Sequence, residues 1–379
     1  MEPLLGKSLN ELQQIAIEAG LPRFVGKQLC EWIYRKRVTS FDAMTNISLK
    51  ARQALQEKYC IGRIQPTAEA VSQDGTRKYL FPVSPSVGDA AHSIILPKAP
   101  QYIECVYLPE DDRVTLCVST QAGCKMGCKF CMTGTLGFHG NLSAAEILAQ
   151  VLHFPDLTNL VVMGEGEPMD NIDGILRALR VLTSDWGLGW SGKRITVSTV
   201  GILPRPNGSI PALQRFLDET DCHLAISLHN AFPEERAAIM PAQRLTPISE
   251  VLDLVRQYDW SKQRRLSFEY ICWSGMNDDL PHAKQLLRLV SGLPCRVNLI
   301  RFHEGVESRK HPTNAQACED PKQTKAESSQ TYFPASDEQR MVAFRDYLSA
   351  HGVTCTIRRS RGEDILAACG MLVNALQEQ

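Results

Sequence analysis

The chain has 379 residues, more than the roughly 100 to 200 usual for one domain, so we expect one large domain with appendages or two to three smaller ones. A net charge of −1 argues against a protein whose whole surface binds nucleic acid, so any RNA contact must be local. No apolar run approaches the ~18 residues of a membrane span and the N-terminus lacks a secretion signal, so the composition predicts a soluble, cytoplasmic protein without membrane contact.

Residues 1–62 are predicted to form a small helical domain. Ser8 and Glu11 form a capping box that opens a first helix through Ala19, and two further helices are expected over residues 28–37 and 48–58. Lys and Arg outnumber Asp and Glu by ten to six over residues 1–65, with clusters at 35–37 and at 50 and 52. Such clusters are typical either of a solvated helix face or of a surface that follows RNA phosphates.

Residues 63–112 are predicted to form a β-hairpin and a connecting segment. Strands at 67–71 and 77–81 flank Asp74-Gly75, a hairpin signal, and a further strand over 103–108 carries Glu104. A Pro- and Ser-containing connection over 84–100 separates them.

Strands and helices alternate from residue 113 to residue 357. The predicted strands cover 114–119, 160–163, 195–199, 224–228, 266–271, 297–302 and 354–358. The predicted helices cover 143–152, 172–182, 211–217, 247–258, 279–290 and 337–350. This rhythm predicts an α/β fold with a parallel sheet, closed as a full or partial (β/α) barrel whose chemistry lies at the carboxyl ends of the strands. A polar insertion over 303–336 is expected to be a loop, and in the C-terminal segment, 358–379, residues 363–376 have a helical pattern.

Thirteen cysteines in a chain without a secretion signal favour metal or redox chemistry. Cys124, Cys128 and Cys131 form a C-x3-C-x2-C triplet, which can hold three corners of a 4Fe–4S cluster and leave one iron open. The alternative is a structural zinc site, which would need a fourth ligand such as Cys117 or His139.

Several polar residues lie at or beyond the ends of predicted strands. Gly166 and Glu167 follow one strand, Ser198 lies in the next, and Ser227 and His229 share one face of a third, with Asn298 in a fourth. Such groups could hold a nucleoside cofactor in a barrel mouth, although a single inward polar residue is more often part of the core.

The chain resembles the RlmN/Cfr family of radical S-adenosylmethionine RNA methyltransferases, from about Leu9 to Leu372. The motifs that carry the resemblance are the triplet within CVSTQAGCKMGCKFCMTG, GEP at 166–168, STVG at 198–201, SLH at Ser227, Leu228 and His229, VNLI at 297–300 and RGEDILAACG at 361–370. The resemblance implies a partial barrel of the radical S-adenosylmethionine type. It also implies one 4Fe–4S cluster on the triplet and S-adenosylmethionine held by Gly166, Glu167, Ser198, Ser227, Leu228, His229 and Asn298.

The resemblance further implies a mechanism for methylating an adenine ring carbon. One S-adenosylmethionine methylates Cys369, and a second is cleaved at the cluster to a radical that takes hydrogen from this methyl group. The resulting carbon radical adds to the adenine. Glu104 would then remove the ring proton, and Cys117 would attack the sulfur of Cys369 to release the product with a transient disulfide.

The implied substrate is an adenosine of 23S ribosomal RNA, methylated at carbon 2, with tRNA as a further substrate. We also expect an electron donor such as flavodoxin or ferredoxin, and a monomeric enzyme. Arg358, Arg359 and Arg361 are suited to contact RNA beside Cys369. Two alternatives stay open, methylation at carbon 8 and a non-catalytic, zinc-stabilised RNA-binding module. Glu165 stands where the family commonly has Met, which bears on the choice of RNA.

Overall fold

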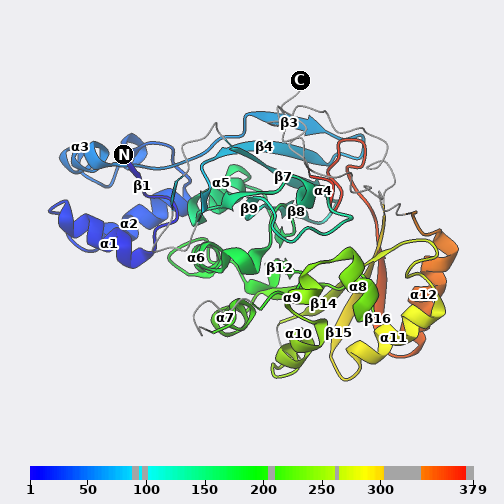
Figure 1. The fold of residues 1–379 in the computed structure, drawn as a ribbon. Coiled ribbons are helices and arrows are strands. Elements are labelled where there is room, and N and C mark those ends of the chain that lie inside the picture. The colour runs from blue at the N-terminus through cyan, green and yellow to red at the C-terminus, as the bar shows by residue number, and fades with distance from the viewer. Residues whose placement is uncertain (88–93, 96–100, 204–209, 261–263, 303–333, 373–379) are drawn as a thin grey trace, which may run out of the picture.

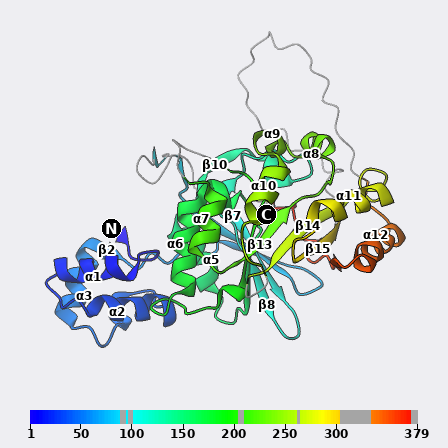
Figure 2. The same cartoon turned by 90° about the horizontal axis from the view of Figure 1, so that it is seen from below.

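The computed structural model describes residues 1–87, 94–95, 101–203, 210–260, 264–302 and 334–372. Its N-terminal helices lie at one side of a large α/β body (Figures 1 and 2). Among the described residues, no helix is long and apolar enough to span a membrane. Most of the predicted 303–336 insertion, from 303 to 333, lies outside the described residues.

The N-terminal unit contains three α-helices and a short two-stranded sheet. The helices are α1 (Leu9–Glu18), α2 (Val25–Cys30), which continues as the π-helical turn η1 (Glu31–Arg35), and α3 (Leu49–Lys58). Strands β1 (Glu2–Pro3) and β2 (Tyr59–Cys60) pair in parallel. The predicted capping box of Ser8 and Glu11 is confirmed, whereas the second helix begins three residues earlier than predicted.

A ten-stranded sheet forms the centre of the molecule. Its order is β16-β15-β14-β13-β12-β11-β8-β7-β4-β3. The parallel strands are β8 (Val114–Cys117), β11 (Asn159–Val162), β12 (Ile195–Thr199), β13 (His223–Ser227), β14 (Leu266–Cys272), β15 (Cys295–Arg301) and β16 (Thr354–Arg358). The antiparallel extension is β3 (Ala68–Val71), β4 (Arg77–Val83) and β7 (Gln101–Pro109), so the predicted hairpin joins the same sheet as the barrel strands.

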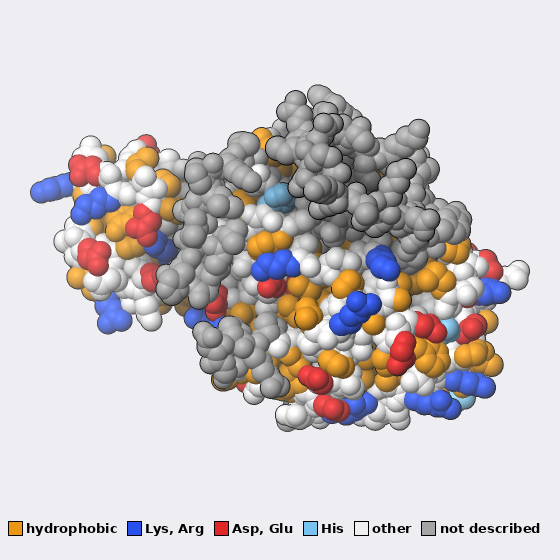
Figure 3. All heavy atoms as spheres, in the orientation of Figure 1, with side chains coloured by type: hydrophobic (Ala, Val, Ile, Leu, Met, Phe, Trp, Pro, Cys, Tyr) orange, Lys and Arg blue, Asp and Glu red, His pale blue; other side chains and the backbone are white. Residues whose placement is uncertain are grey.

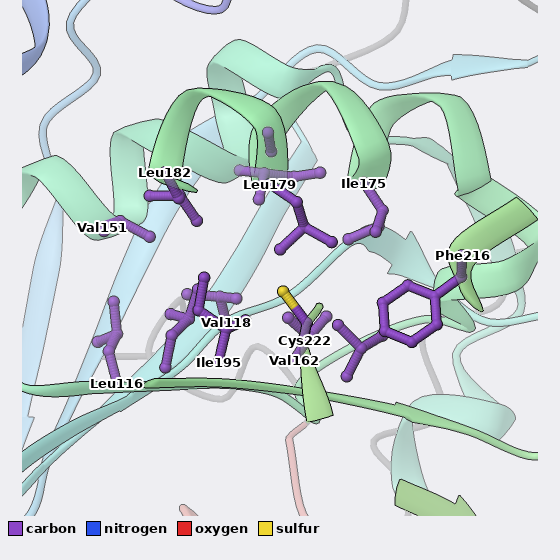
Figure 4. Packing of buried hydrophobic residues seen from close by; sticks show 14 of the residues in the cluster. Leu116, Val118, Val151, Val162, Ile175, Leu179, Leu182, Ile195, Phe216 and Cys222 are labelled. Carbon is purple, nitrogen blue, oxygen red and sulfur yellow. The ribbon is translucent and has the colours of Figure 1, made fainter. Parts of the chain in front are cut away.

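Helices cover the outer face of this sheet. They are α5 (Ala144–His153), α6 (Ile172–Thr183), α7 (Ala212–Glu219), α10 (Ile248–Val255), α11 (Leu280–Val290) and α12 (Glu338–Ala350). Figure 4 shows Leu179 and Leu182 of α6 above Leu116 of β8 and Ile195 of β12, all of them buried. Because side chains alternate along a strand, the residues between these apolar ones point into the barrel. The parallel alternation that the sequence predicts is confirmed, and the barrel is partial because β16 and β3 remain edge strands.

The sequence did not indicate two small features around the cysteine triplet. Strands β9 (Gln121–Gly123) and β10 (Phe138–Asn141) form a hairpin whose loop carries the triplet and the short helix α4 (Met132–Thr135), and this hairpin belongs to a four-stranded sheet with β5 (Ser86–Val87) and β6 (Ile94–Ile95). Helices α8 (Pro233–Ile239) and α9 (Ala242–Leu245) follow β13. These elements are too short to show a clear hydrophobic period.

The C-terminal segment runs from β16 to the β3–β4 hairpin, where Figure 1 shows the red chain beside the blue strands. Arg361 Nε donates to Asp74 Oδ2 at 2.9 Å, and Asp364 Oδ1 accepts from Ser72 Oγ at 2.6 Å. The prediction of a helix over 363–376 is wrong for its described part, 363–372, which forms turns. Leu366 has a φ of 53°, which a right-handed helix does not allow, and the segment gains tertiary hydrogen bonds in exchange.

Candidate active site

Two cavities meet inside the partial barrel, and both are lined by Cys369. The first, here called the cluster cavity, is lined by Cys124, Cys128, Cys131, Gly166, Glu167, Ser198, Ser227, His229, Glu269, Arg358 and Cys369, among others. The second, here called the thiol cavity, is lined by Thr115, Cys117, Cys131, Thr196, Arg265, Arg358 and Cys369, among others. Most residues that the sequence singled out therefore lie around one connected space.

The triplet lies in the loop between β9 and β10, where backbone hydrogen bonds fix it. Cys124 N–H donates to the carbonyl of Gly137 at 2.9 Å, and Cys131 N–H donates to the carbonyl of Cys128 at 3.1 Å. Burial raises the pKa of the Cys124 thiol to about 12 and that of Cys128 well above its usual value. A bound cation is therefore needed to keep these sulfurs as thiolates, and an iron–sulfur cluster supplies one.

The positions of possible metal ligands also bear on the alternative of a zinc site. Within the described parts of the chain, no three His, Cys, Asp or Glu side chains converge closely enough to hold a single metal ion. A 4Fe–4S cluster binds its cysteines at different corners, so its ligands lie farther apart than those of a zinc ion.

Gly123 allows the sharp turn at which the loop carrying the cysteine triplet begins. Its φ is +70°, and a Cβ placed there would come within 1.9 Å of the Gly137 carbonyl oxygen. We expect Gly123→Ala to lower the free energy of unfolding by roughly 3 kcal/mol or more and to reduce iron incorporation. Urea unfolding and iron analysis would measure both effects.

Gly189→Ala is the matched control for that substitution. Gly189 has a φ of +65°, but no atom lies within 4 Å of the added Cβ. It should therefore show only the cost of the left-handed backbone, about 1–2 kcal/mol. Equal unfolding midpoints for the two variants would contradict the steric account of Gly123.

Glu167 is buried at the turn that follows β11. Oε1 accepts from Thr199 Oγ1 at 2.5 Å and from Met169 N–H at 3.0 Å, while Oε2 accepts from Val200 N–H at 2.9 Å. Burial raises the pKa of this carboxyl to about 7, although the three donors oppose the shift. Since a carboxylate has about four acceptor positions, one remains for a cationic ligand in the cluster cavity.

Glu165, two residues earlier, faces the interior of the protein instead. Its carboxylate accepts from Glu104 N–H at 2.8 Å and from Gly123 N–H at 3.3 Å. Burial raises the pKa of Glu165 to about 8, and the nearby Glu104 adds to the shift. Glu165, which departs from the family pattern, therefore fixes the start of the cluster loop through its hydrogen bond to Gly123.

Ser198, Ser227 and His229 form a polar wall of the cluster cavity. The two serine hydroxyls lie 3.4 Å apart. His229 Nδ1 accepts from Ile271 N–H at 3.1 Å, and burial lowers the pKa of the imidazole to about 3. His229 is therefore neutral with its proton on Nε2, and it can donate one hydrogen bond.

Two predicted cofactor-binding residues do not line the cluster cavity. The side chain of Leu228 packs into the main hydrophobic core. Asn298 lies level with Glu269 in the sheet, and its Nδ2 donates to Glu269 Oε1 at 2.8 Å. Glu269, which the sequence reasoning missed, lines the cavity and connects Asn298 to Arg358 at 3.3 Å. The signal that could have revealed it is a charged residue in an otherwise mostly apolar strand.

Cys117 and Cys369 are brought together from 252 positions apart in the sequence. Both line the thiol cavity, and Cys117 packs on the cluster of Val106, Ala367 and Leu372. Burial, together with the charge of the neighbouring Cys369, raises the pKa of the Cys117 thiol to about 12. Arg358 lowers the pKa of both thiols from the same cavity wall.

Glu104 lies in β7 on the same face as Val106, but it is fully buried. Its Oε1 is 2.9 Å from Lys78 Nζ, and the Lys78 side chain is 1% exposed. Lys78 Nζ also donates to the carbonyl of Leu366 at 3.4 Å. The predicted proton acceptor is thus linked to the turn that carries Cys369 rather than placed on a cavity wall.

The basic residues that the sequence assigned to RNA are partly engaged within the chain. Arg35 Nε donates to the Gly187 carbonyl at 3.0 Å, and Arg37 Nη1 donates to the Phe154 carbonyl at 2.5 Å. Arg361 bonds to the β3–β4 hairpin. Arg35 and Arg37 thus fasten the N-terminal helices to the barrel, whereas Arg359 is exposed beside the thiol cavity.

Comparisons with family models agree with this architecture. The model of the radical SAM superfamily matches residues 118–287, and the model of the ribosomal RNA large subunit methyltransferase N-terminal domain matches residues 3–61. The first match covers the strands and loops that build the cluster cavity from one side. The second covers the helical N-terminal unit.

Similar proteins span the whole chain. A probable dual-specificity RNA methyltransferase RlmN of Bacteroides fragilis is 48% identical and covers 100% of this chain and 98% of its own length. The dual-specificity RNA methyltransferase RlmN of Geobacter sulfurreducens is 36% identical over 99% of this chain and 93% of its own length. The crystal structure of a radical SAM methyltransferase from Sphaerobacter thermophilus aligns with a TM-score of 0.79 at 34% identity, covering 98% of this chain and 99% of that one.

Proposed function

We propose that this chain, which belongs to the RlmN family of radical S-adenosylmethionine RNA methyltransferases, methylates carbon 2 of an adenosine in 23S ribosomal RNA and also accepts tRNA. Its cofactors are a 4Fe–4S cluster and S-adenosylmethionine, with two molecules of the latter per turnover. The observation that carries the proposal is the position of Cys369, which lines both the cluster cavity and the thiol cavity. A group on this sulfur can face the cofactor on one side and a substrate on the other.

The residues of the cluster cavity are assigned to the cofactors. Cys124, Cys128 and Cys131 would ligate three irons, and the free acceptor position of Glu167 suits the ammonium group of S-adenosylmethionine. When bound, the cofactors supply a transferable methyl group and an abstracting radical, which an electron-poor ring carbon requires. The hydroxyls of Ser198 and Ser227 and the Nε2–H of His229 are the remaining polar groups that would orient the nucleoside part.

The thiol pair is assigned to the transfer itself. Cys369 would accept the methyl group and carry its carbon to the adenine. Once the adduct has given up the ring proton and one electron to the redox partner, Cys117 would attack the Cys369 sulfur, so that an S–S bond forms as the S–C bond breaks. The departing carbon would keep the bonding pair and take a proton to become the methyl group. Glu104 is assigned to the ring proton. Its buried ion pair with Lys78 implies that the turn at Leu366 must shift before the carboxylate reaches a base in the cavity.

Nucleoside analysis tests the proposed substrate. Anaerobically reconstituted enzyme, with flavodoxin and its reductase as electron donor, would be incubated separately with unmodified 23S rRNA and tRNA, followed by digestion and mass spectrometry. We expect 2-methyladenosine from both RNAs. Formation of 8-methyladenosine would replace the assigned carbon, and the absence of any methyladenosine would refute the methyltransferase proposal.

Metal analysis and gel filtration of the same preparation test the remaining parts. We expect about four irons per chain, since three thiolates are available for one cluster. We also expect a monomer on gel filtration. A colourless protein with one zinc per chain would instead support the RNA-binding module. Because ribosomal RNA and tRNA are made and modified in the cytoplasm, we assign the enzyme to that compartment.

A further inference from the structure

The open lower end of the barrel is lined by basic side chains, of which Arg265 and Arg296 are exposed to solvent. Arg265 precedes β14 in the same alternation as the inward residues Ser267 and Glu269, and Arg296 of β15 alternates with Asn298. His223 occupies the corresponding position in β13, where its Nδ1 accepts from Arg265 N–H at 2.8 Å. In a closed (β/α) barrel, branched apolar side chains fill these layers. In this partial barrel, the end at the N-termini of the strands carries basic side chains instead.

These residues line a pocket of about 600 Å³, here called the arginine pocket, which contains Lys193, His223, Arg264, Arg265 and Arg296. Of the described residues, no Asp or Glu lines it. Arg264 has an ion pair with Asp221 at 4.0 Å and a further acidic neighbour in Asp218. Lys193, Arg265 and Arg296 form no ion pair within the described ranges. Burial, together with the surrounding cations, lowers the pKa of His223 to about 4.

The arginine pocket adjoins the thiol cavity. Arg265 lines both spaces, and the thiol cavity has a volume of about 520 Å³ and extends to Cys117 and Cys369. Among the described residues that line the thiol cavity, Glu110 is the one acid, and it is paired with Arg113. A path of positive charge therefore runs from the surface at the N-terminal ends of the strands to the two reactive thiols.

We propose that the arginine pocket binds the phosphates of the RNA strand on either side of the target adenosine, so that the adenine enters the barrel from the N-terminal ends of the strands. This inference rests on the proposed function, because it assigns the route by which that substrate reaches Cys369. Arg and Lys without acidic partners are the groups that bind phosphates. Each of the two connected spaces has the volume of a small-ligand pocket, roughly 300–1,000 Å³, which suits an unstacked nucleotide better than a folded protein.

The division of the barrel into two entrances follows from this route. The cofactor occupies the cluster cavity at the carboxyl ends of the strands, and the RNA arrives from the opposite end. Cys369 lies where the two spaces meet, so neither ligand has to leave before the other reaches the sulfur. On the face shown in Figure 3, by contrast, basic and acidic side chains are interspersed without a single-sign patch.

The test is an Arg265→Ala and Arg296→Ala double variant of the full-length, cluster-loaded enzyme. Filter binding to in-vitro-transcribed 23S rRNA should show an affinity about tenfold lower near 0.1 M salt, and the slope of log affinity against log salt should fall by about 1.4, for two single-strand contacts. Iron content and the urea unfolding midpoint should be unchanged, which shows that the variant folds. Restoring charge with Arg265→Lys and Arg296→Lys should recover most of the affinity.

The matched control is Lys284→Ala with Arg288→Ala on α11, which removes two exposed charges on the outer surface. Equal RNA affinity for control and test variants would overturn the inference. Unchanged RNA affinity with slower reduction by flavodoxin, but not by dithionite, would instead identify the pocket as a protein docking site and also overturn it. If wild-type enzyme binds RNA through this pocket but forms no methyladenosine, the proposed function fails and this inference stands.

Discussion

Replacing Cys369 with alanine is expected to reduce methyladenosine formation to background, while the cluster still forms and S-adenosylmethionine is still cleaved. Apart from the triplet residue Cys131, Cys369 is the single thiol among the described residues that lines both cavities. With Cys131 assigned to iron, no other thiol among the described residues is therefore placed to carry carbon from the cofactor side to the substrate side. Mass spectrometry of the intact protein should find one methyl group on wild-type enzyme and none on the variant.

Cys60→Ala is the control for this substitution. Cys60 lies in β2 of the N-terminal unit and lines neither cavity. Its variant should retain wild-type iron content, protein methylation and product. A Cys369→Ala enzyme that still methylated RNA would show that the carbon moves directly from the cofactor, and the proposed role of the C-terminal segment would be wrong.

Much of the fold could be predicted because its strands carry their own signal. Apolar residues that cover the sheet, such as Leu116 and Ile195, recur at every strand, and the helices between them have one apolar face. The C-terminal helix could not be excluded in the same way. Its residues have acceptable helical propensity, and the competing bonds from Asp364 to Ser72 and from Lys78 to Leu366 join positions almost 300 residues apart.

The candidate site also has a part that local motifs indicate and a part that depends on contacts between distant strands. The triplet, Glu167 and the serine pair lie in local motifs, so the family resemblance could single them out as candidates. Glu269 and the Lys78 partner of Glu104 act through contacts between distant strands, which the sequence does not display. The inward direction of Arg265 and Arg296 was available from the alternation with Ser267 and Asn298, but only strand register shows that they share a pocket.

Replacing Cys117 with alanine is expected to trap a covalent protein–RNA adduct. The thiol lies in β8, between partners Val106 in β7 and Val161 in β11, and packs against the segment that carries Cys369. Without this sulfur the carbon attached to Cys369 can add to the adenine, but the S–C bond has no attacking thiol. Product should fall to background, and a slowly migrating, nuclease-sensitive protein band should accumulate on denaturing gels.

The double variant Cys117→Ala and Cys369→Ala separates this trap from an adventitious crosslink, since it should form no such band. Cys105→Ala is the neighbouring control, because Cys105 points to the outer core from β7 and lines neither cavity. Normal turnover by the Cys117→Ala enzyme would require another thiol within reach of Cys369. In the described structure, the remaining cysteine of the thiol cavity is Cys131, whose sulfur would be held on iron. The position of Cys117 thus makes a covalent adduct the expected endpoint of its loss.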